Sequence, residues 1–183
     1  MSDPEFVEWP KIPRLNREII VTEKIDGTNA AVIVLEDGSV HAQSRTRLIT
    51  PGNDNFGFAA WVEASAEELS ADLGPGHHFG EWYGKGIQRG YGLEERRFML
   101  FNTKRWENEL LPDRVDVATV LHRGPFFDSD AIWDVVDCLY QNGSQHVPGF
   151  DKAEGVVVFH TAANACFKVL CEGDEIPKGE ADD

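Results

Sequence analysis

The sequence predicts an α+β domain built mainly from antiparallel strands. Short β-branched or alternating apolar runs recur along the chain, a hairpin signal joins two of them, and only two segments have helical spacing. At 183 residues the chain is long enough for one domain with a proper core and too short for two ordinary ones. Its 42% hydrophobic and 27% charged residues are typical of a soluble globular protein.

The N-terminal half is expected to begin with strands and to end in a helix. A β-branched run at residues 19–23 predicts the first strand. Asp37-Gly38 separates the apolar run 30–36 from the alternating run 39–43 and predicts a hairpin, because both residues tolerate positive φ. Apolar residues at helical spacing from 58 to 73 predict a helix, which the following Gly-Pro-Gly should end.

The C-terminal half combines further strands with a second helix. That helix should begin near Asp128-Ser129, bury one apolar face and end at Gly143. Apolar runs predict the remaining strands at residues 78–82, 98–103, 115–121, 155–160 and 165–171.

Charge is distributed unevenly along the chain. Residues 172–183 hold six acids and one lysine, so we expect a folded domain over 1–171 followed by an acidic, solvated tail. The net charge of −15 excludes a uniformly basic nucleic-acid binder. Six basic residues against two acidic ones between 85 and 105 mark the place where a polyanion would bind, although they could also be ordinary solvated charges.

The cysteines, the N-terminal residues and the length of the apolar runs indicate the cellular compartment. Three cysteines form an odd set without metal-binding spacing, so reduced thiols and no structural zinc are expected. The acidic N-terminus has no signal-peptide pattern, and no apolar run approaches the ~20 residues of a membrane span. We therefore expect a cytoplasmic protein that does not enter a membrane.

A lysine at the end of the first predicted strand is the first candidate for chemistry. Lys24 is followed by Asp26 and Gly27, and a glycine lets the backbone turn tightly and approach a ligand. A lysine at such a strand end can act as a nucleophile if its amine is kept neutral. The alternative is a surface turn, because short motifs often match by chance.

Five other positions carry residue types suited to binding a nucleotide. The Arg45 guanidinium suits phosphate oxygens, and Glu81 is a carboxylate between aromatic residues. Phe101 could stack on a base, and Glu154 stands directly before a buried strand. Lys168 lies inside an apolar strand, where burying an ammonium is costly unless an anion meets it. Each also has a plain alternative as a core residue or a solvated one.

The order of these motifs resembles the covalent nucleotidyltransferase superfamily of polynucleotide ligases and mRNA capping enzymes. The resemblance covers about residues 20–170, and its first motif is most similar to phage-type, ATP-dependent RNA ligases that seal nicks. The motifs, in chain order, are Thr22-Glu23-Lys24-Ile25-Asp26-Gly27-Thr28-Asn29, Ser44-Arg45, Phe79-Gly80-Glu81, Phe98-Met99-Leu100-Phe101, Glu154-Gly155-Val156-Val157 and Phe167-Lys168.

This resemblance implies an adenylyltransferase fold, with antiparallel sheets flanked by helices and a nucleotide in the cleft between them. It implies that Lys24 attacks the α-phosphorus of ATP, releases pyrophosphate and holds AMP as a phosphoramidate. The AMP would pass to the 5′-phosphate of an RNA end or nick, and a 3′-hydroxyl would then expel it.

The resemblance also implies a role for each remaining motif residue. Glu154 would bind Mg²⁺, with Asp26 assisting through water, because magnesium prefers oxygen ligands. The other implied nucleotide contacts are Lys168 to the α-phosphate, Arg45 to a phosphate, Glu81 to a ribose hydroxyl, Phe101 to the purine, Glu23 to the adenine amino group, and Asn29 beside the phosphate with Gly27 in the turn.

Two features depart from the family pattern. The last motif usually has a second lysine two residues after the first, and this chain has Leu170 there. Fifteen residues follow Lys168, so we expect no additional nucleic-acid-clamping domain. The chain would then either act on RNA ends delivered by a partner protein, which could supply the missing domain, or hold its substrate weakly. The alternatives are a DNA ligase, a capping guanylyltransferase that uses GTP, or a module that binds nucleotide or RNA without catalysis.

Overall fold

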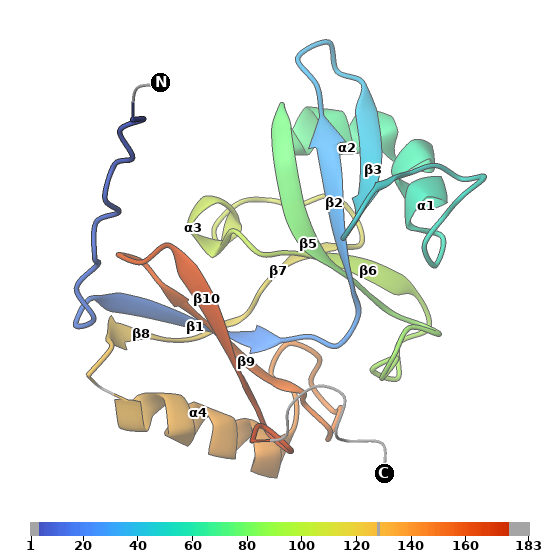
Figure 1. The fold of residues 1–183 in the computed structure, drawn as a ribbon. Coiled ribbons are helices and arrows are strands. Elements are labelled where there is room, and N and C mark those ends of the chain that lie inside the picture. Colours follow the sequence, from blue (N-terminus) through green and yellow to red (C-terminus); the bar gives the residue numbers. More distant parts are fainter. Residues whose placement is uncertain (1–3, 128, 176–183) are drawn as a thin grey trace.

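The chain folds into two β-sheets that lie side by side, with helices on their outer faces (Figure 1). The computed structural model describes residues 4–127 and 129–175. The smaller sheet has the strand order β10-β9-β1-β8, and the larger sheet the order β4-β3-β2-β5-β6-β7. All strand pairs are antiparallel except β6 with β7, which confirms the predicted α+β class.

The element bounds follow the chain order. The strands are β1 Glu18–Lys24, β2 Thr28–Val34, β3 Val40–Ser44, β4 Leu48–Ile49, β5 Gly76–Gly84, β6 Arg96–Leu100, β7 Val115–Val117, β8 Val120–Pro125, β9 Gly155–His160 and β10 Ala165–Leu170. The helices are α1 Phe58–Ala64, α2 Ala66–Leu73, α3 Thr103–Trp106 and α4 Ser129–Asn142.

Each sheet has a hydrophobic core of its own. Aromatic side chains dominate the core of the larger sheet, where the rings of Trp61 on α1 and Trp82 on β5 stack with centroids 5.0 Å apart. Aliphatic side chains form the other core, in which Val21 of β1 packs with Leu139 of α4. Both Val21 and Leu139 are fully buried, and burial stabilises such a side chain by roughly 1.5–3 kcal/mol.

The link between β1 and β2 is the feature that positions the site. The chain leaves the smaller sheet after Lys24 and enters the larger sheet at Thr28, so residues 25–27 connect the two sheets. Gly27 packs so closely on β5 that a Cβ there would lie 2.5 Å from the carbonyl oxygen of Trp82. A side chain at this position would therefore push the link away from β5.

Two predicted elements are each divided in the structure. The helix expected over 58–73 is two helices, because Ser65 leaves helical geometry at φ −106° and ψ 14°. The strand expected over 115–121 is β7 of the larger sheet and β8 of the smaller one, with the chain crossing between the sheets at 118–119. An apolar run that crosses from one buried sheet to another keeps its composition, so periodicity does not reveal the break.

Other strand and helix boundaries differ less. The strand expected to reach 103 ends at Leu100, because Asn102 accepts a hydrogen bond from the Arg105 amide and caps α3. The short strand β4 was not predicted. Of the remaining expectations, Asp128 at the start of α4 and residues 176–183 of the acidic tail lie outside the described residues.

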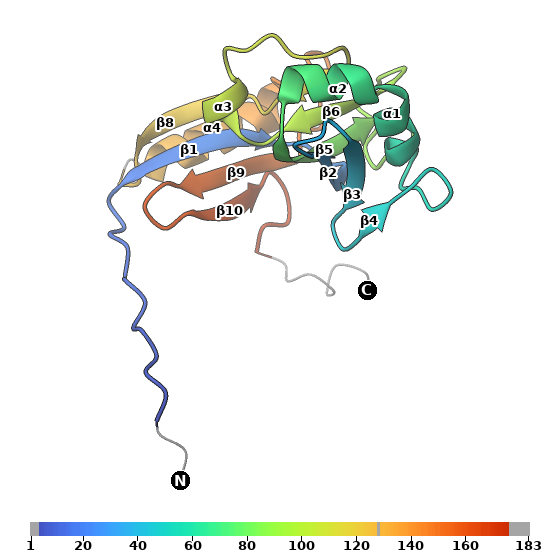
Figure 2. The ribbon, with the colours of Figure 1, turned by 90° about the horizontal axis from the view of Figure 1, so that it is seen from above.

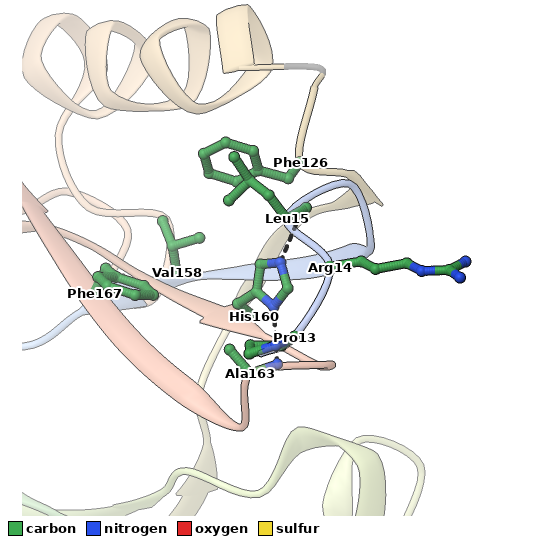
Figure 3. Close-up of a pocket in the computed structure, with 8 residues that line it drawn as sticks. All are labelled: Pro13, Arg14, Leu15, Phe126, Val158, His160, Ala163 and Phe167. Atoms are coloured by element: carbon green, nitrogen blue, oxygen red, sulfur yellow. Dashed lines mark hydrogen bonds between the residues drawn. The ribbon is translucent and has the colours of Figure 1, made fainter. Parts of the chain in front are cut away.

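The segment before β1 extends away from the domain (Figure 2). It is joined to β9 by His160, whose Nε2 donates to the Leu15 carbonyl at 2.7 Å while its Nδ1 accepts from the Ala163 amide at 3.0 Å (Figure 3). An apolar pocket of about 280 Å³ adjoins this histidine. Within the described residues, no helix combines the length and the apolar character that a membrane crossing requires.

Candidate active site

A cleft of about 1080 Å³ opens between the two sheets and is lined by half of the ten predicted site residues. The smaller sheet contributes side chains from β1, β9 and β10 to its wall, and the larger sheet contributes side chains from β2, β5 and β6. Five of the predicted residues line it directly: Glu23, Lys24, Asn29, Glu81 and Phe101.

Lys24 is the last residue of β1, and its amine contacts the carboxylate of the residue directly before β9. Its Nζ lies 2.7 Å from Oε2 of Glu154, and the two side chains are only 25% and 16% exposed. The register explains this contact, since Lys24 is opposite Gly155 in the β1–β9 pair and Glu154 directly precedes Gly155. Gly155 has a φ of +149°, a conformation that side chains disfavour, so this turn into β9 favours glycine.

Glu81 is buried in the cleft and does not face solvent. It lies on β5 opposite Asn29 of β2, and the Asn29 amide nitrogen donates to its Oε2 at 2.9 Å. Only 8% of Glu81 is exposed, and this burial raises its pKa to about 7 against the opposing effects of Lys24 and the Gly27 amide. The cleft therefore holds a carboxyl group that changes charge near neutral pH.

Glu23 is 1% exposed and turns away from its neighbour Lys24. Its Oε2 accepts hydrogen bonds from the backbone amides of Gln145 at 2.9 Å and His146 at 2.8 Å. Its Oε1 has no partner among the described residues, although Glu23 lines the cleft. A buried acceptor without a donor is costly, so this oxygen marks a place where a ligand N–H would be stabilised.

Asp26 lies in the link between the sheets, where it is held on both sides. Its backbone amide donates to the Tyr91 hydroxyl at 2.7 Å, and its carboxylate accepts from Arg89 Nε at 3.1 Å. Arg89 also donates to the carbonyls of Lys152, at 2.8 Å, and Ala153, so it ties this link to the segment that carries Glu154. Glu154 thus contacts the Lys24 amine, and Asp26 is tied through Arg89 to the segment that carries Glu154.

Comparison with known proteins assigns this arrangement to a family. The sequence model of the RNA ligase family matches residues 17–170, which is most of the chain. The chain belongs to the RNA ligase family. No curated protein matches it as a sequence relative.

Solved RNA ligase structures share the fold. An archaeal ATP-dependent RNA ligase aligns with a TM-score of 0.63 at 18% identity, covering 88% of this chain and 48% of that one. A variant of the Naegleria gruberi RNA ligase with ATP and Mn aligns with a TM-score of 0.57 at 18% identity, covering 85% and 49%. This RNA ligase-family chain therefore spans about half the length of these two structures.

Lys168 and Leu170 occupy defined rows of the smaller sheet. Lys168 is opposite Val157, which lines the cleft, so its side chain is on the cleft face of β10. Leu170 is opposite Gly155 and therefore shares the row of Lys24. A lysine at position 170 would stand in the row of Lys24, whereas Lys168 stands about 7 Å along the strand from that row.

Phe101 lies on the opposite wall of the cleft and is 43% exposed. Its backbone amide donates to the Phe79 carbonyl at 3.0 Å, which places two aromatic residues next to each other on this wall. The alternative that Phe101 is a core residue is wrong, because the core on this strand is formed by Phe98 and Leu100.

Arg45 and the basic segment are placed differently from the other candidates. Arg45 is exposed between β3 and β4, outside the cleft lining. Of the six basic residues between 85 and 105, only Lys104 and Arg105 line the cleft. The others include Arg97, which binds Asp116 through two hydrogen bonds of 2.8 and 2.9 Å. Four of the six, Arg89, Arg96, Arg97 and Arg105, hydrogen-bond to other parts of the fold.

Sequence reasoning missed residues in loops and at sheet edges. Arg89, Gln145 and His146 contact site residues only after the chain has folded, and no spacing signals them. Arg123 of β8 also lines the cleft and was not identified. Its position opposite Ile20 in the β1–β8 pair is visible only once strand pairing is known.

Proposed function

We propose that this chain is the nucleotidyltransferase part of an ATP-dependent RNA ligase and that Lys24 is its nucleophile. The observation that supports this proposal is the enclosed position of the Lys24 amine, in one cleft with Glu81 and 2.7 Å from Glu154. The similar structures, an archaeal ATP-dependent RNA ligase and a Naegleria gruberi RNA ligase with ATP and Mn, agree with this chemistry.

The reaction begins with a neutral amine at Lys24. Nζ attacks the α-phosphorus of ATP, a P–N bond forms, the bond to the pyrophosphate oxygen breaks, and the amine loses a proton. The enzyme-bound AMP then passes to a 5′-phosphate, which restores the amine. A 3′-hydroxyl attacks the activated 5′-phosphate, forms the phosphodiester and releases AMP.

The carboxylate that contacts Lys24 and the carboxylate in the following link suit a magnesium ion. Glu154 and Asp26 offer the hard oxygen ligands that Mg²⁺ prefers, and both lie next to the amine or its turn. A bound Mg²⁺ would favour the neutral amine and offset charge on the polyphosphate. Lys168, on the cleft face of β10, would add positive charge where the α-phosphate develops negative charge.

Both sheets supply contacts for the nucleoside, Phe101, Glu81 and Asn29 from the larger sheet or the residue directly after β6, and Glu23 from β1 of the smaller sheet. Phe101 offers an exposed ring on the cleft wall, and base–aromatic stacking contributes about 1–3 kcal/mol per base. The unpartnered Oε1 of Glu23 suits the amino group of adenine, which donates hydrogen bonds. Glu81, with Asn29 beside it, suits a ribose hydroxyl.

The proposal also covers the RNA substrate, the role of Arg45, a partner protein and the cellular location. RNA ends or a nick are the substrate that family membership supports. A role for Arg45 would have to involve a phosphate outside the cleft, because Arg45 does not line it. A partner protein that helps hold the RNA and a cytoplasmic location stay predictions.

A second candidate is nucleotide binding without transfer. Leu170 favours it, because an apolar residue stands in the Lys24 row where the family has a lysine. This candidate predicts that AMP or ATP binds the cleft and that no covalent adduct forms.

Incubation with α-labelled ATP and Mg²⁺, followed by denaturation, separates these candidates. Folded protein freed of bound AMP should retain the label, and Lys24→Ala should lose it. Lys85→Ala is the matched control, because Lys85 is an exposed lysine whose carboxylate contact is 3.5 Å long. No label on the wild-type protein would contradict the proposal, and more label from GTP than from ATP would favour capping chemistry. Transfer to nicked RNA or nicked DNA then distinguishes the two kinds of ligase.

A further inference from the structure

Three segments far apart in the sequence form a closed ring of hydrogen bonds behind the cleft. The Glu23 amide donates to the Thr119 carbonyl at 3.0 Å. The Thr119 hydroxyl contacts Nδ1 of His146 at 2.8 Å. The His146 amide donates to the Glu23 carboxylate at 2.8 Å, which closes the ring. The ring joins the end of β1, the crossing between β7 and β8, and the loop after α4.

The other side of the His146 ring is also held. Nε2 lies 3.1 Å from the Tyr83 hydroxyl, which donates to Asp116 at 2.8 Å. Arg97 binds the same Asp116 carboxylate with two hydrogen bonds. Because the Tyr83 proton goes to Asp116, its oxygen accepts from Nε2–H, and Nδ1 accepts from the Thr119 hydroxyl. Burial lowers the pKa of His146, which favours the neutral imidazole that this pattern requires.

The network determines how the Glu23 carboxylate is oriented. Two backbone amides hold Oε2, at 2.9 Å from Gln145 and 2.8 Å from His146. With Oε2 held, rotation of the carboxylate would break both hydrogen bonds. The other oxygen, Oε1, is therefore left buried without a partner among the described residues, on a residue that lines the cleft. A carboxylate oxygen accepts hydrogen bonds and cannot donate one, so it distinguishes an amino group from a carbonyl.

We propose that Thr119, His146 and Tyr83 are positioning residues that make the cleft select a purine with an amino group at C6. This proposal rests on the proposed function, in which the cleft holds a purine nucleotide. An adenine amino group satisfies Oε1, whereas a purine without that group leaves a buried carboxylate oxygen unpaired. When the ring is broken, the carboxylate is free to turn, and the two purines should bind almost equally well.

Calorimetric binding to the full chain tests this selection without requiring ligation. Wild-type protein should bind AMP at least about tenfold more tightly than purine riboside 5′-monophosphate, which lacks the amino group. Thr119→Val removes only the hydroxyl that reaches His146, and it should lower this ratio about tenfold. Thr119→Ser keeps the hydroxyl and should restore the ratio. His146→Ala should lower the ratio in the same way and provides a second variant if Thr119→Val does not fold.

His160→Ala is the matched control for removing a buried histidine. His160 makes two hydrogen bonds near the N-terminal segment and does not line the cleft, so its loss should reduce stability and leave the ratio unchanged. Equal binding of both nucleotides by the wild-type protein would overturn the proposal, as would a wild-type ratio in both Thr119→Val and His146→Ala. Selective AMP binding without labelling by ATP would contradict the ligase function and still support the positioning role.

Discussion

The two sheets contribute different chemistry to the same cleft. The smaller sheet places charged groups there, with Lys24 at the end of β1 and Lys168 on the cleft face of β10. The larger sheet places Glu81 and Phe101 on the opposite wall, where they suit a sugar and a base. The proposed reacting groups therefore lie on the smaller sheet together with Glu23, the groups for sugar and base stacking lie on the other wall, and the three-residue link 25–27 connects the two sheets.

The cores behind the two walls differ in the same way. Aliphatic side chains between β1, β9 and α4 support the charged wall. A cluster of aromatic rings under α1 and α2 supports the other wall, with Phe58 and Trp82 centred 5.3 Å apart. Substitutions on the charged wall should therefore change the rate of AMP transfer most, and substitutions on the other wall should also change nucleotide binding or stability.

The largest effect is expected for Glu154 on the charged wall. Glu154→Ala removes the carboxylate 2.7 Å from the Lys24 amine and should slow adenylylation about a thousandfold, near 4 kcal/mol of transition-state stabilisation. Asp151→Ala, at an exposed carboxylate three residues earlier, should stay within about twofold of the wild-type rate. The rate of label incorporation measures the effect of each variant. Equal rates for the two variants would contradict a special role for the carboxylate that contacts Lys24.

On the nucleoside wall, Glu81 should make folding stability depend on pH. Burial raises its folded-state pKa to about 7 from 4.5, so the folded state binds more protons than the unfolded state between these values. Stability should therefore fall as pH rises through this range, by up to about 3 kcal/mol. Glu81→Gln should remove this fall, while Glu94→Gln, at an exposed side chain, should keep it. Parallel denaturant-unfolding curves for wild-type protein and Glu81→Gln across the range would contradict the burial of this charge.

A smaller effect is expected for Lys168, the second charge on the smaller sheet. Its side chain is exposed and lies two residues from the Lys24 row, so Lys168→Ala should slow adenylylation only about tenfold. The rate should be measured at saturating ATP, and a change confined to the KM for ATP would instead assign Lys168 to ground-state binding.

The smallest effect is expected for Arg45, which belongs to neither wall. Because Arg45 does not line the cleft, Arg45→Ala should change adenylylation by less than about twofold. A loss of tenfold or more in the same labelling assay would show that the β3–β4 turn takes part in the first step.

The sequence predicted the parts of the site that lie in or beside strands. Lys24, Glu81 and Glu154 follow or precede apolar runs, so their positions near the cleft could be inferred from local pattern and motif order. The groups that hold Glu23 could not be predicted, because Gln145 and His146 lie in the loop after α4, and their contacts depend on how that loop packs on the end of β1. The break at Ser65 and the crossing at 118–119 were missed for a related reason: both depend on tertiary packing.

Peptide mapping by mass spectrometry tests the central claim most directly. Wild-type protein incubated with ATP and Mg²⁺ should carry one adenylyl group, located on the Lys24 side chain. An adenylyl group located on any other residue, or folded nucleotide-free protein that acquires none, would contradict the account.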